Sequence, residues 1–278
     1  MISFPNCKIN IGLHVVRRRE DGYHDLETIF VPVPLCDELE MDIAESFSFE
    51  QNGIDIACNN EDNLVVRTYR LMQKTYKERI KPVSIHLRKN IPFGAGLGGG
   101  SSDAAFTIKM LNGLFDLNLT TETMERLASK LGADCAFFIN NETAFATGIG
   151  DCLTKVGFNP LKGYKLIMIK PDETVSTAEA YSGIVPRERK TKGKCDLTEA
   201  IKKPVCEWKD IIVNDFEETV FKKHPSLATI KESLYSHGAI YAAMSGSGST
   251  VFGIIDDNNN ENFHLDIDVN YKVYTFNF

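Results

Sequence analysis

The distribution of apolar and polar residues predicts short strands in the first third of the chain. Four segments are rich in β-branched and apolar residues, as strands are: 9–16, 27–33, 39–44 and 83–88. Ahead of the fourth, apolar residues recur at helical spacing from Leu64 to Met72, and Asp62 stands where an N-cap is expected. We therefore predict a helix that begins just after Asp62.

The same pattern predicts helices and strands over the rest of the chain. A second helix is expected to begin near Ser101 or Ser102, and a third to run from about Thr121 to Leu131, with Gly132 as its stop. Further strands are expected at 142–147, 164–170, 239–244, 250–255 and 272–276, and further helices near 208–222 and 226–237.

The order of these elements indicates an α+β protein with two lobes. The stretch G-F-N-P-L-K-G-Y at 157–164 has the composition of a connection between domains. We therefore expect an N-terminal domain at 1–157 and a C-terminal domain at 158–278, and the length of 278 residues allows both a sizeable core. A cleft between two lobes is a natural ligand site.

Composition and charge exclude several classes of protein. Apolar residues make up 43% and charged residues 25%, as in soluble globular proteins. The net charge of −7 speaks against a nucleic-acid partner, because such proteins usually carry a basic excess. Seven scattered cysteines without a C-x-x-C pair, no signal-peptide pattern and no long apolar run lead us to expect a reduced, cytoplasmic protein without a membrane partner. The oligomeric state is left open.

One glycine-rich segment carries the strongest chemical signal. Residues 91–105 read I-P-F-G-A-G-L-G-G-G-S-S-D-A-A and lead directly into the second predicted helix. Such a loop lets backbone N–H groups approach an anion, and the helix dipole adds positive potential at the same place. A tight turn would need only one or two glycines, so we predict a phosphate-binding loop, in which Ser101 and Ser102 can offer hydroxyls to phosphate or magnesium.

Three common phosphate loops fit this segment poorly. Gly94 to Gly99 satisfies G-x-G-x-x-G, but the preceding V-S-I-H-L-R-K-N alternates polar and apolar residues, unlike the buried parallel strand of a dinucleotide fold. A P-loop needs Lys before its Ser or Thr, whereas Gly100 is followed by two serines. Neither the strand lysine nor the H-R-D motif of protein kinases is present.

The segment P-x-G-x-G-L-G-G-G-S-S-D-A-A at 92–105 resembles the phosphate loop of the GHMP kinases. Five flanking segments resemble one branch of that family: P-N-C-K-I-N-I-G-L-H-V at 5–15, R-E-D-G-Y-H-D-L-E-T-I-F at 19–30, E-D-N-L-V at 61–65, L-G-A-D-C-A-F-F-I at 131–139 and S-G-S-G-S-T-V-F at 245–252. The branch more often has P-A-K where this chain has Pro5-Asn6-Cys7-Lys8. The last twenty or so residues match no part of the family that we recognise.

The resemblance implies a fold and a reaction. The fold would be the two-lobed GHMP kinase fold, with a ribosomal-protein-S5-like N-terminal domain and a ferredoxin-like α/β C-terminal domain. The reaction would use ATP and Mg²⁺ to phosphorylate the C2 hydroxyl of 4-diphosphocytidyl-2-C-methyl-D-erythritol, a small-molecule intermediate of the non-mevalonate isoprenoid pathway. Phosphoryl transfer of this kind depends on positioning and charge stabilisation more than on covalent catalysis.

Two residues are candidates for the chemistry. Asp134 follows the helix stop Gly132 and precedes the apolar run C-A-F-F-I, a position that also suits a turn aspartate. Lys8 lies in an otherwise apolar strand, where it either has a buried partner or reaches solvent with its ammonium. The resemblance implies that Asp134 is the general base and that Lys8 pairs with it and neutralises charge on the transferred group.

Further residues are candidates for binding the acceptor. Asn10 shares a strand face with Lys8 at period 2, and the resemblance implies that it contacts the acceptor's hydroxyls. Tyr23 and His24 follow Gly22 in a predicted turn. The resemblance implies that this pair holds the cytosine, with the histidine hydrogen-bonding and stacking, and that Tyr181 in V-S-T-A-E-A-Y stacks on the other face of the base. Tyr23, Tyr164 and Tyr241 are alternatives to Tyr181 in the pocket.

On the nucleotide side, the resemblance assigns the start of the first helix and the glycine loop to ATP. Lys89 could reach the nucleotide or be an ordinary strand-end lysine. Asp103 could bind magnesium, or it could be present only because an acid is favoured in a helix's first turn. The expected ATP-binding residues are Asn63, Leu64, Lys89, Pro92, Phe93, Gly94, Ala95, Gly96, Leu97, Gly98, Gly99, Gly100, Ser101, Ser102 and Asp103. The sequence does not identify the metal ligands.

Two other segments and the competing functions complete the picture. S-G-S-G-S at 245–249 either closes over the site or forms a tight turn, and the basic segment 186–194 is expected to be a surface loop.

The alternatives to the reaction above are a homoserine or mevalonate type of GHMP kinase, an NAD-binding oxidoreductase and a non-catalytic GHMP-fold protein. G-Y-H at 22–24 speaks against the first, and the joint presence of Lys8 and Asp134 against the last.

Overall fold

The structure is a computed structural model that describes residues 1–55, 59–186, 196–256 and 270–278. The chain divides into two compact units. Unit 1 contains Met1–Lys8, Pro32–Phe93 and Gly98–Glu142, and unit 2 contains Ile9–Val31, Gly94–Leu97 and Thr143–Phe278. Each unit is therefore built from separate chain segments, and the domain boundary between 157 and 158 stays a prediction.

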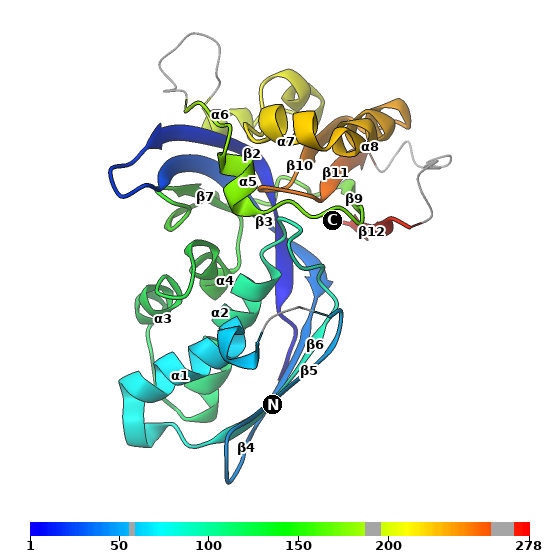
Figure 1. Cartoon of the computed structure of the whole chain (residues 1–278). Coiled ribbons are helices and arrows are strands. Elements are labelled where there is room, and N and C mark those ends of the chain that lie inside the picture. The colour runs from blue at the N-terminus through cyan, green and yellow to red at the C-terminus, as the bar shows by residue number, and fades with distance from the viewer. Residues whose placement is uncertain (56–58, 187–195, 257–269) are drawn as a thin grey trace. The chain divides into compact units, whose positions relative to one another are not determined.

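Unit 1 combines a sheet with helices. The sheet has the strand order β1 (Ile2–Ser3), β4 (Glu38–Ile43), β6 (Val83–Lys89), β5 (Ser48–Gly53). The helices are α1 (Leu64–Tyr76), α2 (Gly99–Leu114), α3 (Thr121–Ala128) and α4 (Phe137–Asn140). Helix α2 packs against α1 and contacts β4 (Figure 1). Strand β6 buries alternate residues, as its sequence predicts, and pairs antiparallel with β4 and parallel with β5.

Unit 2 contains two further sheets. The first has the order β2 (Asn6–Arg18), β3 (His24–Cys36), β7 (Ala144–Thr147), β8 (Cys152–Lys155), and the first residues of β2 and the last of β3 belong to unit 1. The second is antiparallel, in the order β10 (Tyr241–Met244), β11 (Val251–Asp256), β9 (Tyr164–Lys170), β12 (Lys272–Asn277).

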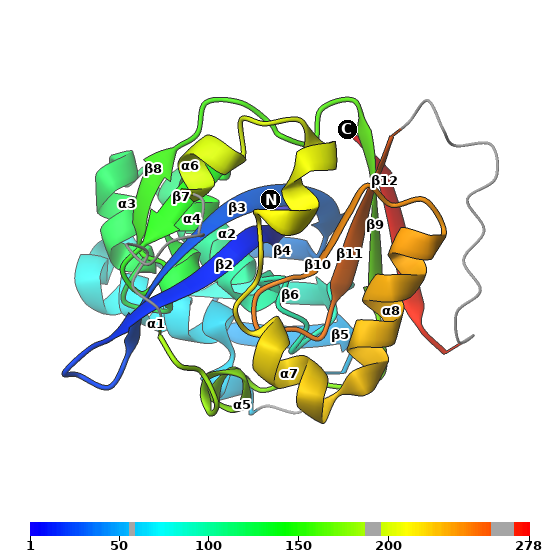
Figure 2. The same ribbon diagram turned by 90° about the horizontal axis from the view of Figure 1, so that it is seen from above.

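The helices of unit 2 are short apart from α8. They are α5 (Thr177–Tyr181), α6 (Leu197–Ala200), α7 (Glu217–Lys223) and α8 (Pro225–Ser236). Helices α7 and α8 lie side by side, and α8 packs on β10 and β11 (Figure 2). Their apolar side chains, such as Val220, Leu227 and Leu234, join those of β9 and β11 in one buried cluster.

The observed elements differ from the predicted ones at a few positions. Asn63, not Asp62, caps α1, because its side chain accepts a hydrogen bond from the Val65 N–H. Helix α2 begins at Gly99, ahead of the predicted serines, since Gly98 is in the left-handed conformation that ends the loop. The third helix ends at Ala128 and continues only as turns.

The helix predicted near 208–222 is wrong in its first half. A 3₁₀ segment covers Val205–Asp210, and α7 begins only at Glu217. Between them the chain runs beside β2, where the Leu13 N–H donates to the Val213 carbonyl. The Asn214 amide donates to two carbonyls, of Met244 and Gly246. In this stretch, hydrogen bonds to distant segments replace the hydrogen bonds of a helix.

Across the part of the chain that the structure describes, none of the helices has both the length and the apolar character needed to cross a membrane.

Candidate active site

The glycine loop runs into the N-terminus of α2, a helix of 16 residues. Gly98 stands at the N-cap with φ of 71°, and it provides no side-chain cap for the N–H groups that follow. A Cβ atom at Gly98 would lie 3.1 Å from Lys8 Cε and 3.1 Å from Phe138 Cζ. Glycine is therefore required here twice, for the backbone conformation and for the close passage of the lysine.

Lys8 and Asp134 meet in unit 1. The Lys8 Nζ lies 3.4 Å from Asp134 Oδ2, with the lysine side chain 4% exposed and the aspartate 32% exposed. Asp134 lies in a 3₁₀ turn, Ala133–Cys135, that follows Gly132. A buried ammonium needs a counter-charge, and the half-open carboxylate supplies one while keeping a face toward solvent. The pairing expected from the sequence is present, whereas the catalytic roles of both residues stay predictions.

Other candidates of unit 1 surround the start of α2. A Cβ atom at Gly100 would lie 3.4 Å from Leu64 Cδ1, so the first residue of α1 is a neighbour of the loop. A Cβ atom at Gly132 would lie 4.0 Å from Ser101 Oγ, which places that hydroxyl beside the turn that carries Asp134. Asn63 is occupied by its cap and by a hydrogen bond to Gln51 at 2.9 Å.

Lys89 is held in a buried cluster beneath the loop. Its ammonium donates to Asp37 and, at 2.6 Å, to Asp103 Oδ2, and its side chain is 2% exposed. Asp37 also accepts from the backbone N–H groups of Asn90 and Ile91. The ammonium keeps a third N–H, but its near-complete burial leaves little access for a nucleotide. The geometry gives Lys89 a part in fixing the base of the loop, and its predicted contact with ATP stays a prediction.

This cluster has one cation for two carboxylates. Burial raises the pKa of Asp103 above its ordinary range; the Lys89 charge opposes this shift, and the Asp37 charge adds to it. Burial alone would lower the pKa of Lys89, but the two carboxylates outweigh burial and raise it. The excess negative charge therefore favours the protonated form of Lys89 against burial, and it adds to the effect of burial on Asp103.

Two polar side-chain atoms near the start of α2 are buried without a hydrogen-bond partner among the described residues. They are Ser102 Oγ and Asp103 Oδ1. No cluster of three or more His, Cys, Asp or Glu side chains with metal-binding geometry occurs in the described ranges. Mg²⁺ bound with ATP needs only one or two protein oxygens beside phosphate and water, so it does not require such a cluster, and the Ser102 hydroxyl would be one oxygen available to it.

The middle of the loop, Gly94–Leu97, packs within unit 2 against the second glycine segment. Gly96 has φ of 73°, and a Cβ atom on it would lie 2.0 Å from the Ser245 carbonyl oxygen. The Ser245 hydroxyl donates to the Gly96 carbonyl at 3.0 Å and accepts from the Asn10 N–H at 3.2 Å. The segment S-G-S-G-S is thus a structural partner of the phosphate loop, and Asn10 lies directly beside it.

Asn10 and His24 are both fixed by neighbours in unit 2. The Asn10 amide donates to Thr28 Oγ1 at 2.9 Å. The rings of His24 and Tyr181 stack with centroids 4.8 Å apart and an interplanar angle of 18°, whereas Tyr23 is 62% exposed. Burial, with a smaller effect of the Arg18 charge, lowers the pKa of His24. A histidine and a tyrosine from distant segments therefore form one aromatic surface, and their direct stacking leaves no room for a base between the two rings. The contacts of Tyr23, His24 and Tyr181 with cytosine stay predictions.

Sequence reasoning missed several residues of these clusters. Asp37 anchors Lys89, Thr28 orients Asn10, and Phe138 packs beneath Gly98. The only sequence feature that could have marked Asp37 as a partner of Lys89 is its position as a lone aspartate between two apolar strands.

Residues 187–194 of the basic segment lie outside the described residues. Pro92 is buried and Phe93 is exposed at the entrance of the loop.

Two family models match the chain in the regions just described. The model "GHMP kinases N terminal domain" matches residues 63–142, which include α1, the end of the loop and Asp134. The model "GHMP kinases C terminal" matches residues 199–267. With the relatives given below, these matches show that the chain belongs to the GHMP kinases, with the fold of that family.

Curated relatives narrow the similarity to one kind of kinase. A protein of Bacteroides thetaiotaomicron is 51% identical over 260 residues, 92% of each chain, and is named 4-diphosphocytidyl-2-C-methyl-D-erythritol kinase. A protein of Cytophaga hutchinsonii with the same name is 48% identical over 95% of each chain. The similarity therefore extends over nearly the full length of both relatives.

Solved structures agree with this result. A crystal structure of 4-(cytidine 5'-diphospho)-2C-methyl-D-erythritol kinase has a TM-score of 0.77 at 30% identity and covers 91% of this chain and 90% of its own. The mevalonate kinase of Methanococcus jannaschii has a TM-score of 0.70 at 15% identity over 99% of this chain and 97% of its own. At that identity the second structure is evidence for the fold alone.

Proposed function

We propose that this chain transfers the γ-phosphoryl group of ATP to the C2 hydroxyl of 4-diphosphocytidyl-2-C-methyl-D-erythritol, a step of the non-mevalonate isoprenoid pathway. The observation that carries the reaction type is the Lys8–Asp134 ion pair, since Lys8 passes directly beneath Gly98 at the start of the phosphate-loop helix. The choice of acceptor is supported by the relatives that carry this name at about half identity.

Asp134 acts as the general base. Its carboxylate accepts the proton of the C2 hydroxyl as that oxygen forms its bond to the γ-phosphorus. The bond from this phosphorus to the bridging oxygen breaks, and the electron pair leaves with ADP. A tertiary alcohol is a weak nucleophile, and a positioned carboxylate of this kind contributes roughly 100- to 10,000-fold. The partial exposure of Asp134 allows a substrate hydroxyl to reach it.

Lys8 orients Asp134. Its ammonium lies 3.4 Å from the carboxylate, and the ion pair holds that carboxylate at the turn where the substrate hydroxyl would approach. The Cε atom that carries this ammonium passes close to Gly98, so Lys8 also contributes positive potential at the start of α2. There the uncapped N–H groups and the helix dipole favour the triphosphate.

Magnesium and the place of action are part of the same proposal. Ser102 would hold Mg²⁺ together with ATP, and the bound ion would neutralise charge on the phosphates. His24 and Tyr181 provide the aromatic surface that a cytosine base requires. We also propose that the protein works in the cytoplasm, where ATP is available and its scattered cysteines stay reduced.

The experiment is a comparison of acceptors. ADP release from ATP and magnesium is measured with 4-diphosphocytidyl-2-C-methyl-D-erythritol, homoserine and mevalonate, each offered alone. We expect turnover with the cytidyl compound only, and ³¹P NMR of the product should show a new phosphate monoester. Turnover with homoserine or mevalonate instead would overturn the acceptor and leave the kinase class standing. Tight binding of NADH would contradict the kinase class itself.

A further inference from the structure

Tyr181 is the last residue of a helix that is too short to be stable by itself. Helix α5 has five residues, Thr177–Tyr181, and its cap is one hydrogen bond from the Glu179 N–H to Ser176 Oγ. Isolated helices of this length are not stable in water. The ring of Tyr181 nevertheless stacks on His24 and meets Phe216 edge-on at a centroid distance of 4.8 Å. Contacts from elsewhere in unit 2 must therefore set its position.

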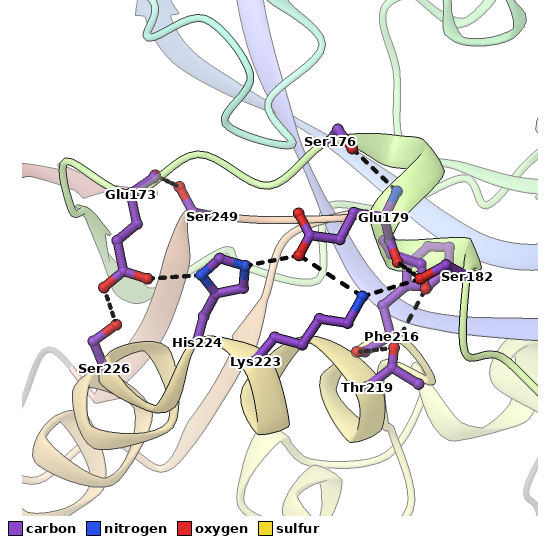
Figure 3. A network of polar contacts seen from close by, with 11 residues as sticks. Glu173, Ser176, Glu179, Ser182, Phe216, Thr219, Lys223, His224, Ser226 and Ser249 are labelled. Carbon is purple, nitrogen blue, oxygen red and sulfur yellow. Dashed lines mark hydrogen bonds and ion pairs between the residues drawn. The ribbon is translucent and has the colours of Figure 1, made fainter.

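Those contacts come from α7 and the residue that follows it. His224 Nε2 bonds Glu179 Oε1 at 3.2 Å, and the Lys223 ammonium lies 3.8 Å from the same oxygen (Figure 3). Lys223 also donates to Ser182 Oγ at 3.0 Å, just beyond α5. The Thr219 hydroxyl donates to the Ala180 carbonyl at 3.3 Å. Helix α5 is thus fastened to α7 by polar side chains.

The second nitrogen of the same imidazole reaches a different segment. His224 Nδ1 bonds Glu173 Oε2 at 2.9 Å, and the other oxygen of this carboxylate accepts from the Ser226 hydroxyl (Figure 3). The Glu173 carbonyl accepts from Ser249 Oγ at 2.5 Å, at the end of the second glycine segment. His224 therefore links the segment on both sides of Val175, from Glu173 to Glu179, to one point on the helix pair.

His224 is itself well fixed. Its backbone N–H closes the last turn of α7 on the Val220 carbonyl at 2.8 Å, and Pro225 starts α8 directly after it. Each of its two ring nitrogens has a carboxylate partner, Glu173 on one side and Glu179 on the other. A fixed side chain with a partner on each side is suited to hold a short helix.

We propose that His224 is a positioning residue for recognition of the pyrimidine base: by bonding Glu179 and Glu173 it holds α5 so that Tyr181 faces His24. The inference rests on the proposed function, because it assigns the His24–Tyr181 surface to the base of the acceptor. His224 does not touch the reacting atoms, and its removal should weaken binding of the cytidyl substrate while leaving ATP and the chemical step as they are.

The test compares His224→Ala with a matched control. Loss of the two hydrogen bonds to Glu179 and Glu173 should raise KM for the cytidyl substrate about 10- to 100-fold, with kcat and KM for ATP within about twofold of wild type. The control is Lys231→Ala on α8: Lys231 is 24% exposed against 20% for His224, and its 2.6 Å ion pair with Glu217 joins α7 to α8 without contacting α5. It should change neither KM.

A conservative variant and a spectroscopic readout complete the design. Glu179→Gln keeps an acceptor for the His224 ring and should retain KM within about threefold, whereas Glu179→Ala should behave as His224→Ala does. In the absence of any substrate, the NMR signals of the His24 ring report stacking on Tyr181. They should move toward free-histidine values in His224→Ala and stay unchanged in Lys231→Ala. If His224→Ala does not fold, Glu179→Ala carries both measurements.

The outcomes separate the two proposals. A wild-type protein that does not phosphorylate the cytidyl compound refutes the proposed function, while the His24 signals still decide whether His224 positions the stack. Unchanged His24 signals and unchanged KM in both alanine variants would overturn the inference. Equal increases in both KM values, or a fall in kcat alone, would also overturn it, because they indicate general damage or a direct catalytic role.

Discussion

Replacement of Lys89 by methionine tests the buried cluster beneath the phosphate loop. Methionine retains the length and apolar volume of the lysine stem and removes only the ammonium. The change leaves Asp37 and Asp103, both almost fully buried, without their common cation. Asp37 keeps the N–H donors of Asn90 and Ile91, so Asp103 is the carboxylate that loses most.

The magnitude follows from the burial of these groups. Removing one partner of a buried ion pair costs about 3–5 kcal/mol, because the remaining charge stays desolvated. The entropy of unfolding of a 278-residue chain makes each kcal/mol lower Tm by roughly 1.7 °C, so Lys89→Met should lower Tm by about 5–9 °C. Lys89→Met/Asp103→Asn should recover much of this loss, since the amide is neutral.

The pH dependence of the stability loss in Lys89→Met provides a second test. The pKa of Asp103 is already raised in the fold by burial, and Lys89 is the group that opposes the shift. Without Lys89 the pKa rises further, so the folded state binds its proton more tightly than the unfolded chain does. The stability that comes from this tighter proton binding is present at low pH, and it is lost as pH rises through the pKa of Asp103 in the folded state. The deficit of Lys89→Met should therefore be smaller at pH 5 than at pH 8.

Thermal unfolding followed by circular dichroism at both pH values measures these effects, with ATP KM determined in parallel. The reasoning is refuted if Lys89→Met keeps its Tm, or if the double variant is no more stable than the single one at pH 8. An unchanged Tm with a raised KM for ATP would instead show that Lys89 contacts the nucleotide, as the sequence alone allowed.

Three further predictions concern the site. Asp134→Asn should lower kcat about 100- to 10,000-fold with little change in ATP affinity, in steady-state ADP release and calorimetry; activity near wild type would exclude the general-base role. Gly96→Ala forces a positive φ and places Cβ against a backbone carbonyl, so it should cost about 2–4 kcal/mol in urea unfolding, clearly more than Gly94→Ala, whose Cβ meets nothing within 4 Å. His24, whose pKa is lowered by burial, should titrate in the fold below its ordinary value of 6.5 in an NMR titration; the neutral ring is favoured in the fold, so stability should rise with pH from the folded pKa to 6.5.

The strands and helices that bury one face were predictable from the sequence. Strand β6 alternates and α1 has apolar positions at helical spacing because each has one side in the core. Strand β5, with the sequence S-F-E-Q-N-G, gives no such signal, since it is polar and mostly exposed. Helix α5 was missed for the related reason that polar side chains of α7 hold it, and these lie far away in the sequence.

The candidate site was predictable in its residue types more than in its contacts. Lys8 was noticeable because a charge in an apolar strand needs a partner, and Asp134 is found at that place. The same argument applies to Lys89, but its partner Asp37 lies at the end of another strand, where nothing in the local pattern marks it. The packing of the loop carbonyls on Ser245 depends on backbone positions that the sequence does not encode locally.

The division of the chain into interleaved segments has a consequence for biosynthesis. Residues Ile9–Val31 belong to unit 2, yet they leave the ribosome long before Thr143–Phe278, which complete that unit. Their strands β2 and β3 must wait for β7 before that sheet can close, while unit 1 has all of its residues once Glu142 has been made. Domains that form as soon as they are synthesised do so from contiguous chain. For this protein a nascent chain stalled between β6 and β7 would expose unpaired strand edges, and the amino-terminal hairpin is the part we expect chaperones to protect.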